Sequence, residues 1–155
     1  MKRVELHTDG SCLGNPGIGG WAYILVYNSF ATEGYGSQAE TTNNQMEIKA
    51  VLEGLKKLIE PCDIVLYTDS EYVANSINTW MAGWLKRQWK NTKNVEMWKE
   101  YVQLMKRGGH KLEAKWVKGH NGHPQNERCD QLARKAAETL KDDLKRQFQY
   151  RKYVR

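Results

Sequence analysis

The first forty residues carry the alternation of apolar and polar positions that is typical of β-strands. Residues 3–8 alternate in this way and predict a strand that ends at Asp9. After a glycine-rich loop, the segments 21–27 and 30–38 predict two further strands joined by a short turn. We therefore expect an antiparallel meander of three strands at the start of the chain.

The middle of the chain combines a long helical pattern with a buried strand. Capping residues stand at 41–44, and an apolar stripe follows them at helical spacing, made of Ile48, Val51, Leu52, Leu55 and Ile59. Pro61 closes this helix. The nearly continuous apolar run 63–68 then predicts a strand that is buried on both faces and ends at Asp69.

Helical and strand patterns also alternate through the second half. Ser70 can cap a helix that runs to about residue 79, residues 95–107 predict another helix, and 111–118 predict a fifth strand. Pro124 suits the first position of a final helix, whose buried stripe comprises Cys129, Leu132, Ala133, Ala136 and Leu140. The order β-β-β-α-β-α-(α)-α-β-α predicts an α/β domain with a mixed sheet and helices packed on its faces.

Length and composition agree with a single globular domain. The chain has 155 residues, of which 40% are hydrophobic and 27% charged. A chain of this size can form a hydrophobic core that needs no disulfide bond or structural metal to stabilise it. We place the domain at 1–140 and regard 141–155, with six basic and two acidic side chains, as a basic tail. The chain lacks the run of about 18 apolar residues that a membrane-spanning helix needs. Its N-terminus enters a strand pattern directly, which does not resemble a signal peptide.

Cysteine usage and net charge suggest a compartment and a kind of partner. An odd, scattered set of cysteines argues against a disulfide framework and fits a reducing compartment, so we expect a cytoplasmic protein: Cys12, Cys62 and Cys129. The net charge of +6 points to a polyanionic partner, with nucleic acid as the first choice. A solvated surface that keeps the protein soluble explains the same charge equally well.

Four carboxylates stand where they can meet in one site. Asp9 and Asp69 each close a predicted strand, and Glu47 and Asp130 lie on helices beside buried stripes. A cluster of this kind repels itself unless a cation neutralises it, and oxygen-only ligands select Mg²⁺ or Mn²⁺. Two such ions can activate a water and stabilise the leaving oxygen of a phosphodiester. By position alone each acid also has a simpler explanation, as a turn former, a helix cap or a solvated helix residue.

Four segments resemble, in order and in spacing, the motifs of bacterial type 1 ribonuclease H, also called ribonuclease HI. They are Thr8-Asp9-Gly10-Ser11-Cys12-Leu13-Gly14-Asn15-Pro16-Gly17, Thr41-Thr42-Asn43-Asn44-Gln45-Met46-Glu47, Tyr67-Thr68-Asp69-Ser70, and Trp116-Val117-Lys118-Gly119-His120 with His123-Pro124 and Asn126 to Asp130. The resemblance covers about residues 2–140. It implies a ribonuclease H-like fold, with three antiparallel strands and then two parallel ones in a five-stranded mixed sheet, and helices on both faces.

The resemblance also implies an activity and a catalytic site. The family's enzymes are metal-dependent endonucleases that cut the RNA strand of RNA–DNA hybrids by two-metal-ion catalysis and leave 5′-phosphate and 3′-hydroxyl ends. The metal-binding acids fall on Asp9, Glu47, Asp69 and Asp130, and the mobile catalytic histidine falls on His120. We expect one or two Mg²⁺ ions, for which Mn²⁺ can substitute, and a monomer with neither a membrane nor an obligate protein partner.

Two further groups match positions that hold the hybrid. The first is polar and surrounds the glycine-rich loop and the first helix: Gly10, Ser11, Cys12, Asn15, Thr42, Asn43 and Asn44. The second lies in residues 80–93, which resemble the basic handle of some family members: Trp80, Trp84, Lys86, Arg87, Trp89 and Lys90. Packing of the tryptophans between helices is the competing explanation for the second group.

Other functions stay open on sequence alone. A related nuclease directed at DNA has similar carboxylates, and a catalytically silent hybrid-binding module has the same motifs. The stretch Gly17-Ile18-Gly19-Gly20-Trp21-Ala22 matches the dinucleotide pattern GxGxxA, but it leads into a strand rather than a helix. A zinc site of His120, His123 and Cys129 lacks a fourth ligand nearby.

Overall fold

A five-stranded mixed sheet forms the centre of the computed structural model, which describes residues 1–119 and 122–153, apart from the side chains at 150, 152 and 153. The sheet order is β3-β2-β1-β4-β5. The first three strands pair antiparallel, while β4 and β5 pair parallel to β1 and to each other. The strands are β1 (Lys2–Cys12), β2 (Gly17–Tyr27), β3 (Phe30–Thr41), β4 (Cys62–Thr68) and β5 (Lys111–Trp116). The predicted fold class is confirmed.

Helices follow the strands in the predicted order. They are α1 (Asn43–Lys56), α2 (Glu71–Asn75), α3 (Met81–Lys86), α4 (Val95–Gly108) and α5 (Pro124–Tyr153), with a π-helical turn at Ser76–Trp80 between α2 and α3. Thr42 caps α1 by accepting from the Gln45 N–H, and Ser70 caps α2 by accepting from the Val73 N–H. Both caps lie at the predicted helix starts.

Several local expectations are wrong. Strand β1 does not end at Asp9 but continues to Cys12, and Asp9 pairs with Ala22 inside it. In the stripe of the last helix, Ala136 and Leu140 are half-buried instead of buried.

Ile59 was expected in the buried stripe of the first helix, yet α1 ends at Lys56 and Ile59 is 98% exposed. The N–H groups of Lys57 and Leu58 donate to carbonyls three residues back, which tightens the last turn and ends the helix before Ile59. The fifth strand ends at Trp116 instead of Lys118, after which the Val117 N–H donates to the Thr68 carbonyl.

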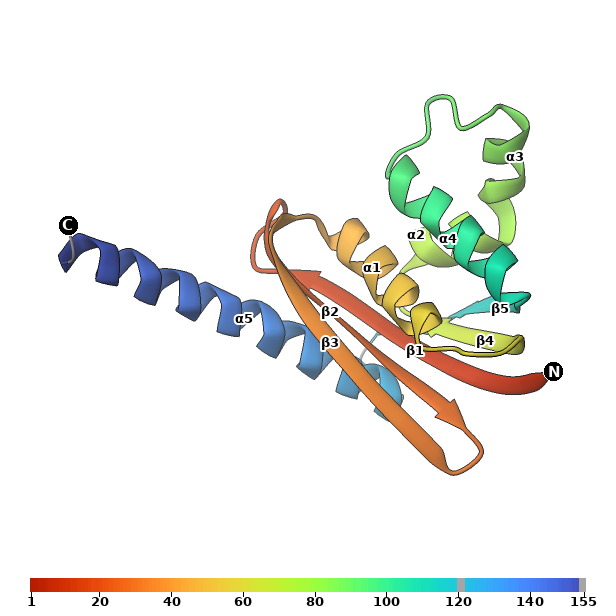
Figure 1. Cartoon of the computed structure of the whole chain (residues 1–155), viewed down its shortest axis with the longest axis horizontal. Helices are drawn as coiled ribbons and strands as arrows, with labels where there is room; N and C mark the ends of the chain where they lie inside the picture. Colours follow the sequence, from red (N-terminus) through yellow and green to blue (C-terminus); the bar gives the residue numbers. More distant parts are fainter. Residues whose placement is uncertain (120–121, 154–155) are drawn as a thin grey trace.

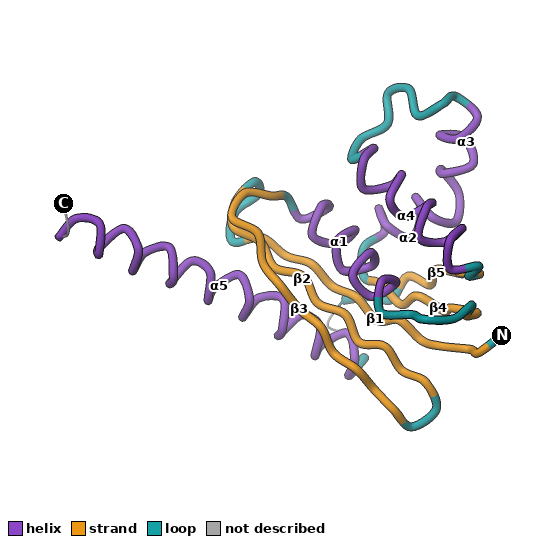
Figure 2. The backbone as a smooth tube through the Cα atoms, in the orientation of Figure 1, coloured by secondary structure: helices purple, strands orange, loops and turns teal. Residues whose placement is uncertain are grey.

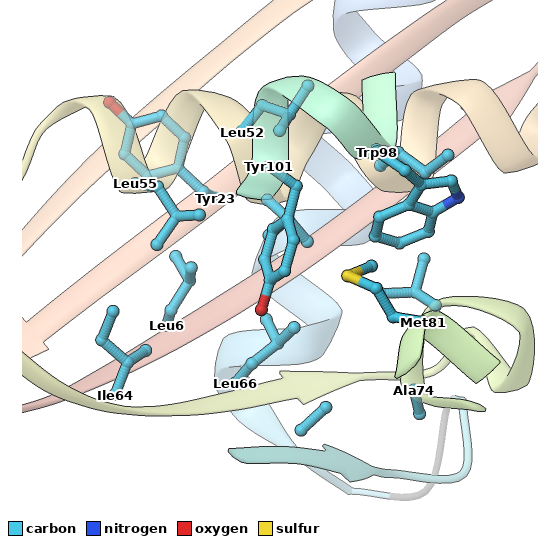
Figure 3. Close-up of a cluster of buried hydrophobic side chains, with 14 of the residues drawn as sticks. Leu6, Tyr23, Leu52, Leu55, Ile64, Leu66, Ala74, Met81, Trp98 and Tyr101 are labelled. Atoms are coloured by element: carbon cyan, nitrogen blue, oxygen red, sulfur yellow. The ribbon is translucent and has the colours of Figure 1, made fainter. Parts of the chain in front are cut away.

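The two faces of the sheet carry different packing (Figure 1). On one face α1, α2 and α4 cover a core of large side chains, among them Leu6, Leu66 and the fully buried Trp98 (Figure 3). On the other face α5 covers a smaller cluster of Ala22, Ile24, Cys129, Leu132 and Ala133. A Cβ atom at Gly20 would collide with the Ala133 carbonyl oxygen, so this glycine is what lets α5 lie directly on β2.

Helix α5 is much longer than the sheet that it covers. Figure 2 shows its C-terminal turns running past the turn between β1 and β2 and away from the rest of the molecule. Residues 141–149 are all exposed. Residues 141–153 of the basic tail therefore continue the last helix. Within the described part of the chain, none of the helices is both long enough and apolar enough to cross a membrane.

Candidate active site

Strand register brings the first two carboxylates together. Strands β1 and β4 are parallel neighbours, and Thr8 lies opposite Thr68. Asp9 and Asp69 each follow these threonines, so their side chains start from adjacent positions at the same edge of the sheet. Asp9 is 3% exposed, and its Oδ1 atom accepts the Gly10 N–H at 2.9 Å.

The third carboxylate arrives because α1 lies against the end of β1. A Cβ atom at Gly10 would collide with the backbone of Met46 and Glu47, so only glycine allows this close approach. The contact directs Glu47, which is 8% exposed, toward Asp9. Asp9, Glu47 and Asp69 each offer one carboxylate oxygen, and these three oxygens lie within 4.8 Å of one another.

The electrostatics of the cluster oppose ionisation. Burial, and after it the negative charge of Asp69, raises the pKa of Asp9 to about 8. Burial, and after it the charges of Asp9 and Asp69, raises the pKa of Glu47 well above its usual range. The Glu47 Oε2 atom has no hydrogen-bond partner among the described residues. Three carboxylate oxygens this close together, two of them from buried side chains, suit a hard divalent cation.

Asp130 lies beside this cluster but outside the set of three. It belongs to α5, and its charge contributes to the raised pKa of Asp9. Its carboxylate forms a bidentate pair with Arg134, with Nη2 to Oδ2 at 2.5 Å and Nε to Oδ1 at 3.4 Å. Asp130 is therefore close enough to act on Asp9 through its charge, while the Arg134 guanidinium pairs with its carboxylate.

Trp116, to which the sequence assigned no role of its own, holds the chain in place at Asp69. The Trp116 indole Nε1 donates to the Asp69 carbonyl at 3.0 Å. In the loop that follows, a Cβ atom at Gly119 would lie 3.1 Å from Asp69 Oδ2, so this loop borders the carboxylate. Trp116 opens the fourth motif, and that was the only signal of its importance. His120 lies outside the described residues.

The polar positions around the glycine-rich loop form one connected surface. The Cys12 N–H donates to Asn43 Oδ1 at 2.9 Å, and the Asn43 N–H donates to Asn15 Oδ1 at 3.1 Å. These bonds join the β1–β2 loop to the start of α1. Thr42 is half-buried as the helix cap, and Asn44 is exposed beside it.

A model of the RNase H family matches residues 1–138. The chain belongs to the ribonuclease H family. It is 61% identical over 145 residues to the ribonuclease H of Campylobacter concisus (strain 13826), covering 94% of this chain and 99% of that one. It is 57% identical over 137 residues to the ribonuclease HI of Campylobacter jejuni subsp. jejuni serotype O:2, covering 88% and 92%. The prediction of a ribonuclease H enzyme is confirmed.

Solved ribonuclease H structures share the fold. LC9-RNase H1, a type 1 RNase H with the type 2 active-site motif, superposes with a TM-score of 0.80 at 32% identity, over 90% of this chain and 74% of that one. LC11-RNase H1, solved in complex with an RNA/DNA hybrid, superposes with a TM-score of 0.69 at 19% identity, over 88% and 98%. Because its identity is only 19%, LC11-RNase H1 shows a shared fold and nothing more.

In the tryptophan-rich segment 80–93 of this ribonuclease H, some side chains pack on the main core and others are exposed. Trp84 lies 5.9 Å from the buried Trp98 and 6.3 Å from Trp89, ring centre to ring centre, and Trp84 and Trp89 both pack on the main core. Trp80 is 43% exposed. The cations of the segment are exposed: Lys86, Arg87 and Lys90. The packing explanation therefore accounts for Trp84 and Trp89, while Trp80 and the cations are accessible.

Proposed function

We propose that this ribonuclease H is an endonuclease that hydrolyses the RNA strand of RNA–DNA hybrids and leaves 5′-phosphate and 3′-hydroxyl ends. The observation that carries the proposal is the convergence of carboxylate oxygens of Asp9, Glu47 and Asp69 within 4.8 Å of one another, in a chain that belongs to the ribonuclease H family. The family motifs surround each of the three residues.

We assign one or two Mg²⁺ ions, which Mn²⁺ can replace, to Asp9, Glu47, Asp69 and Asp130. The donor set is entirely oxygen, and the Oε2 atom of the buried Glu47, which has no hydrogen-bond partner in the described part of the chain, fits a cation ligand. When bound, a pair of such ions supplies an activated water and stabilises the leaving oxygen of the phosphodiester.

The chain's own contacts set the positions of these acids. The Gly10 N–H holds one oxygen of Asp9, and the Trp116 indole holds the backbone carbonyl of Asp69. Arg134 orients the Asp130 carboxylate and neutralises it. Proton transfer or product release is assigned to His120 on its motif alone, because a histidine titrates near neutral pH.

Selection of a hybrid is assigned to the polar surface beside the acids. Asn15, Thr42, Asn43 and Asn44 can both donate to and accept from a ribose 2′-hydroxyl or lie against the backbone. Gly10, Ser11 and Cys12 present a strand end without bulky side chains next to Asp9. LC11-RNase H1, which shares the fold, was solved with an RNA/DNA hybrid. The monomeric state and the cytoplasmic location stay predictions.

The test compares Mg²⁺-dependent cleavage of an RNA–DNA hybrid, double-stranded RNA and double-stranded DNA. We expect cleavage of the RNA strand in the hybrid only. Asp69→Asn should bind the hybrid and fail to cut it. Asp63→Asn is the matched control, because Asp63 lies at the other end of the same strand in a 3.4 Å surface pair with Arg3.

Two other results would replace this proposal. Cleavage of double-stranded DNA alone would indicate a DNA-directed nuclease. Hybrid binding without cleavage by the wild type, in either Mg²⁺ or Mn²⁺, would indicate a silent binding module.

A further inference from the structure

The C-terminal extension of α5 carries a row of cations that begins beside the carboxylates. Arg134, Lys141 and Lys145 are spaced at i, i+7 and i+11, which places them along one side of the helix. Asp130 stands one turn before Arg134 on the same side. At about 1.5 Å per residue, Lys145 lies about 22 Å along the helix from Asp130.

Lys141 and Lys145 are exposed, and neither forms an ion pair with any described residue. The stretch 134–151 contains six basic and three acidic side chains. Glu138 and Asp142 flank the row, and Asp143 lies 3.5 Å from Arg146. The row thus keeps a positive excess that internal pairing does not cancel.

The row runs beside the loop to which substrate contacts are assigned. Lys141 and Lys145 line a hollow of about 550 Å³ together with Ile18 of β2. The Ile18 carbonyl accepts the Leu13 N–H at 2.8 Å and so closes the loop that carries Asn15. Figure 2 shows α5 passing this loop before it leaves the body of the molecule.

We propose that Lys141 and Lys145 on the α5 extension bind backbone phosphates of the nucleic acid held at the carboxylate site, and so lengthen the substrate footprint beyond the catalytic domain. The proposal rests on the proposed function, since it needs a hybrid seated across Asp9 and Asn15. Exposed lysines without acidic partners are suited to phosphate contacts, and such contacts add affinity without sequence preference.

The test measures binding of a 24-base-pair hybrid to full-length Asp69→Asn protein in Mg²⁺ over a series of salt concentrations. The double variant Lys141→Gln/Lys145→Gln should bind about 3- to 30-fold more weakly at 0.1 M salt, and the slope of log affinity against log salt should fall by about 1–2. The matched control is Lys57→Gln/Lys111→Gln. Lys57 follows α1 and Lys111 starts β5, so both lie at the sheet end away from Asp69.

Equal losses in the two double variants would overturn the inference, because net charge alone would then explain them. An unchanged slope in Lys141→Gln/Lys145→Gln would also overturn it, as would a change in self-association by gel filtration without a change in hybrid affinity. Circular dichroism checks that the variants keep the fold. If wild-type protein cuts the hybrid and the slope is unchanged, only this inference fails. If wild-type protein does not cut the hybrid, the proposed function fails.

Discussion

The carboxylate cluster and the tryptophan-rich segment 80–93 differ in what burial does to stability. Burial of Asp9 and Glu47 sets like charges close together and raises both pKa values, which opposes folding at neutral pH. Burial of Trp84 and Trp89 against the main core removes apolar surface from water, which favours folding. Burial that opposes folding points to a functional requirement, whereas burial that favours folding needs no ligand to explain it.

Within the tryptophan-rich segment, Trp84 is packed among other rings whereas Trp80 is partly exposed. Trp84 contacts rings on three sides, namely Trp80, Trp89 and Trp98. Trp80 contacts Trp84 and Tyr72 and leaves 43% of its surface exposed. A handle for nucleic acid would therefore use Trp80 and the exposed cations, and Trp84 would support them from beneath.

Removing one charge from the cluster gives the largest expected effect. Asp9→Asn should lower the rate of Mg²⁺-dependent hybrid cleavage by about 10³-fold or more. The substitution removes a metal ligand, and a bound metal ion stabilises the transition state by several kcal/mol. The metal-free variant should be at least as stable as wild type, because the substitution removes like-charge repulsion. Cleavage rates and urea unfolding measure the two effects. A variant that stays active, or one that loses both activity and stability, would contradict the assignment.

Removing a packed ring should affect stability first. Trp84→Ala should lower the free energy of unfolding by about 2–4 kcal/mol, because it leaves a cavity beside Trp98. Hybrid affinity, measured under conditions where the variant stays folded, should change less than in a variant of an exposed handle residue. Urea unfolding and hybrid binding give the two quantities. Full stability with lost affinity would show that Trp84 acts on the substrate instead.

The free energy of unfolding should depend on pH because of the carboxylate cluster. The pKa of Asp9 is raised to about 8 in the folded state, so the folded protein binds a proton more tightly than the unfolded chain does. The contribution of Asp9 is therefore most favourable below pH of about 4, and it is lost as pH rises toward about 8. Metal-free protein should lose about 1–3 kcal/mol over this window, and Mg²⁺ at pH 8 should restore stability. Asp9→Asn should flatten the profile, and a wild-type curve that rises across the window would refute this account.

The smallest expected effect on stability belongs to the exposed ring. Trp80→Ala should change the free energy of unfolding by about 1 kcal/mol or less, because much of the ring is already in water. Hybrid affinity should fall by about 1–2 kcal/mol if a base or sugar stacks on this ring. Comparison of Trp80→Ala with Trp84→Ala in both assays separates contact with substrate from packing. Equal stability losses would remove the distinction between the two tryptophans.

Strands and helices could be predicted closely because their signals are local. The cap at Thr42 and the proline at 124 lie at the starts of α1 and α5. Ile59 was placed wrongly because helical spacing continues in the sequence after the backbone has left the helix. The π-helical turn at Ser76–Trp80 has no counterpart in apolar periodicity, so the pattern at 70–79 predicted one continuous helix.

By itself the sequence determined the order of the elements, the family and the four candidate acids, because periodicity, capping and motifs are properties of neighbouring residues. The tertiary structure decided how these acids relate to one another. The parallel register of β1 with β4 sets Asp9 beside Asp69, and the absence of a side chain at Gly10 admits Glu47. Arg134 draws the Asp130 carboxylate into a pair of its own. Distances between residues far apart along the chain depend on packing, and no local pattern records them.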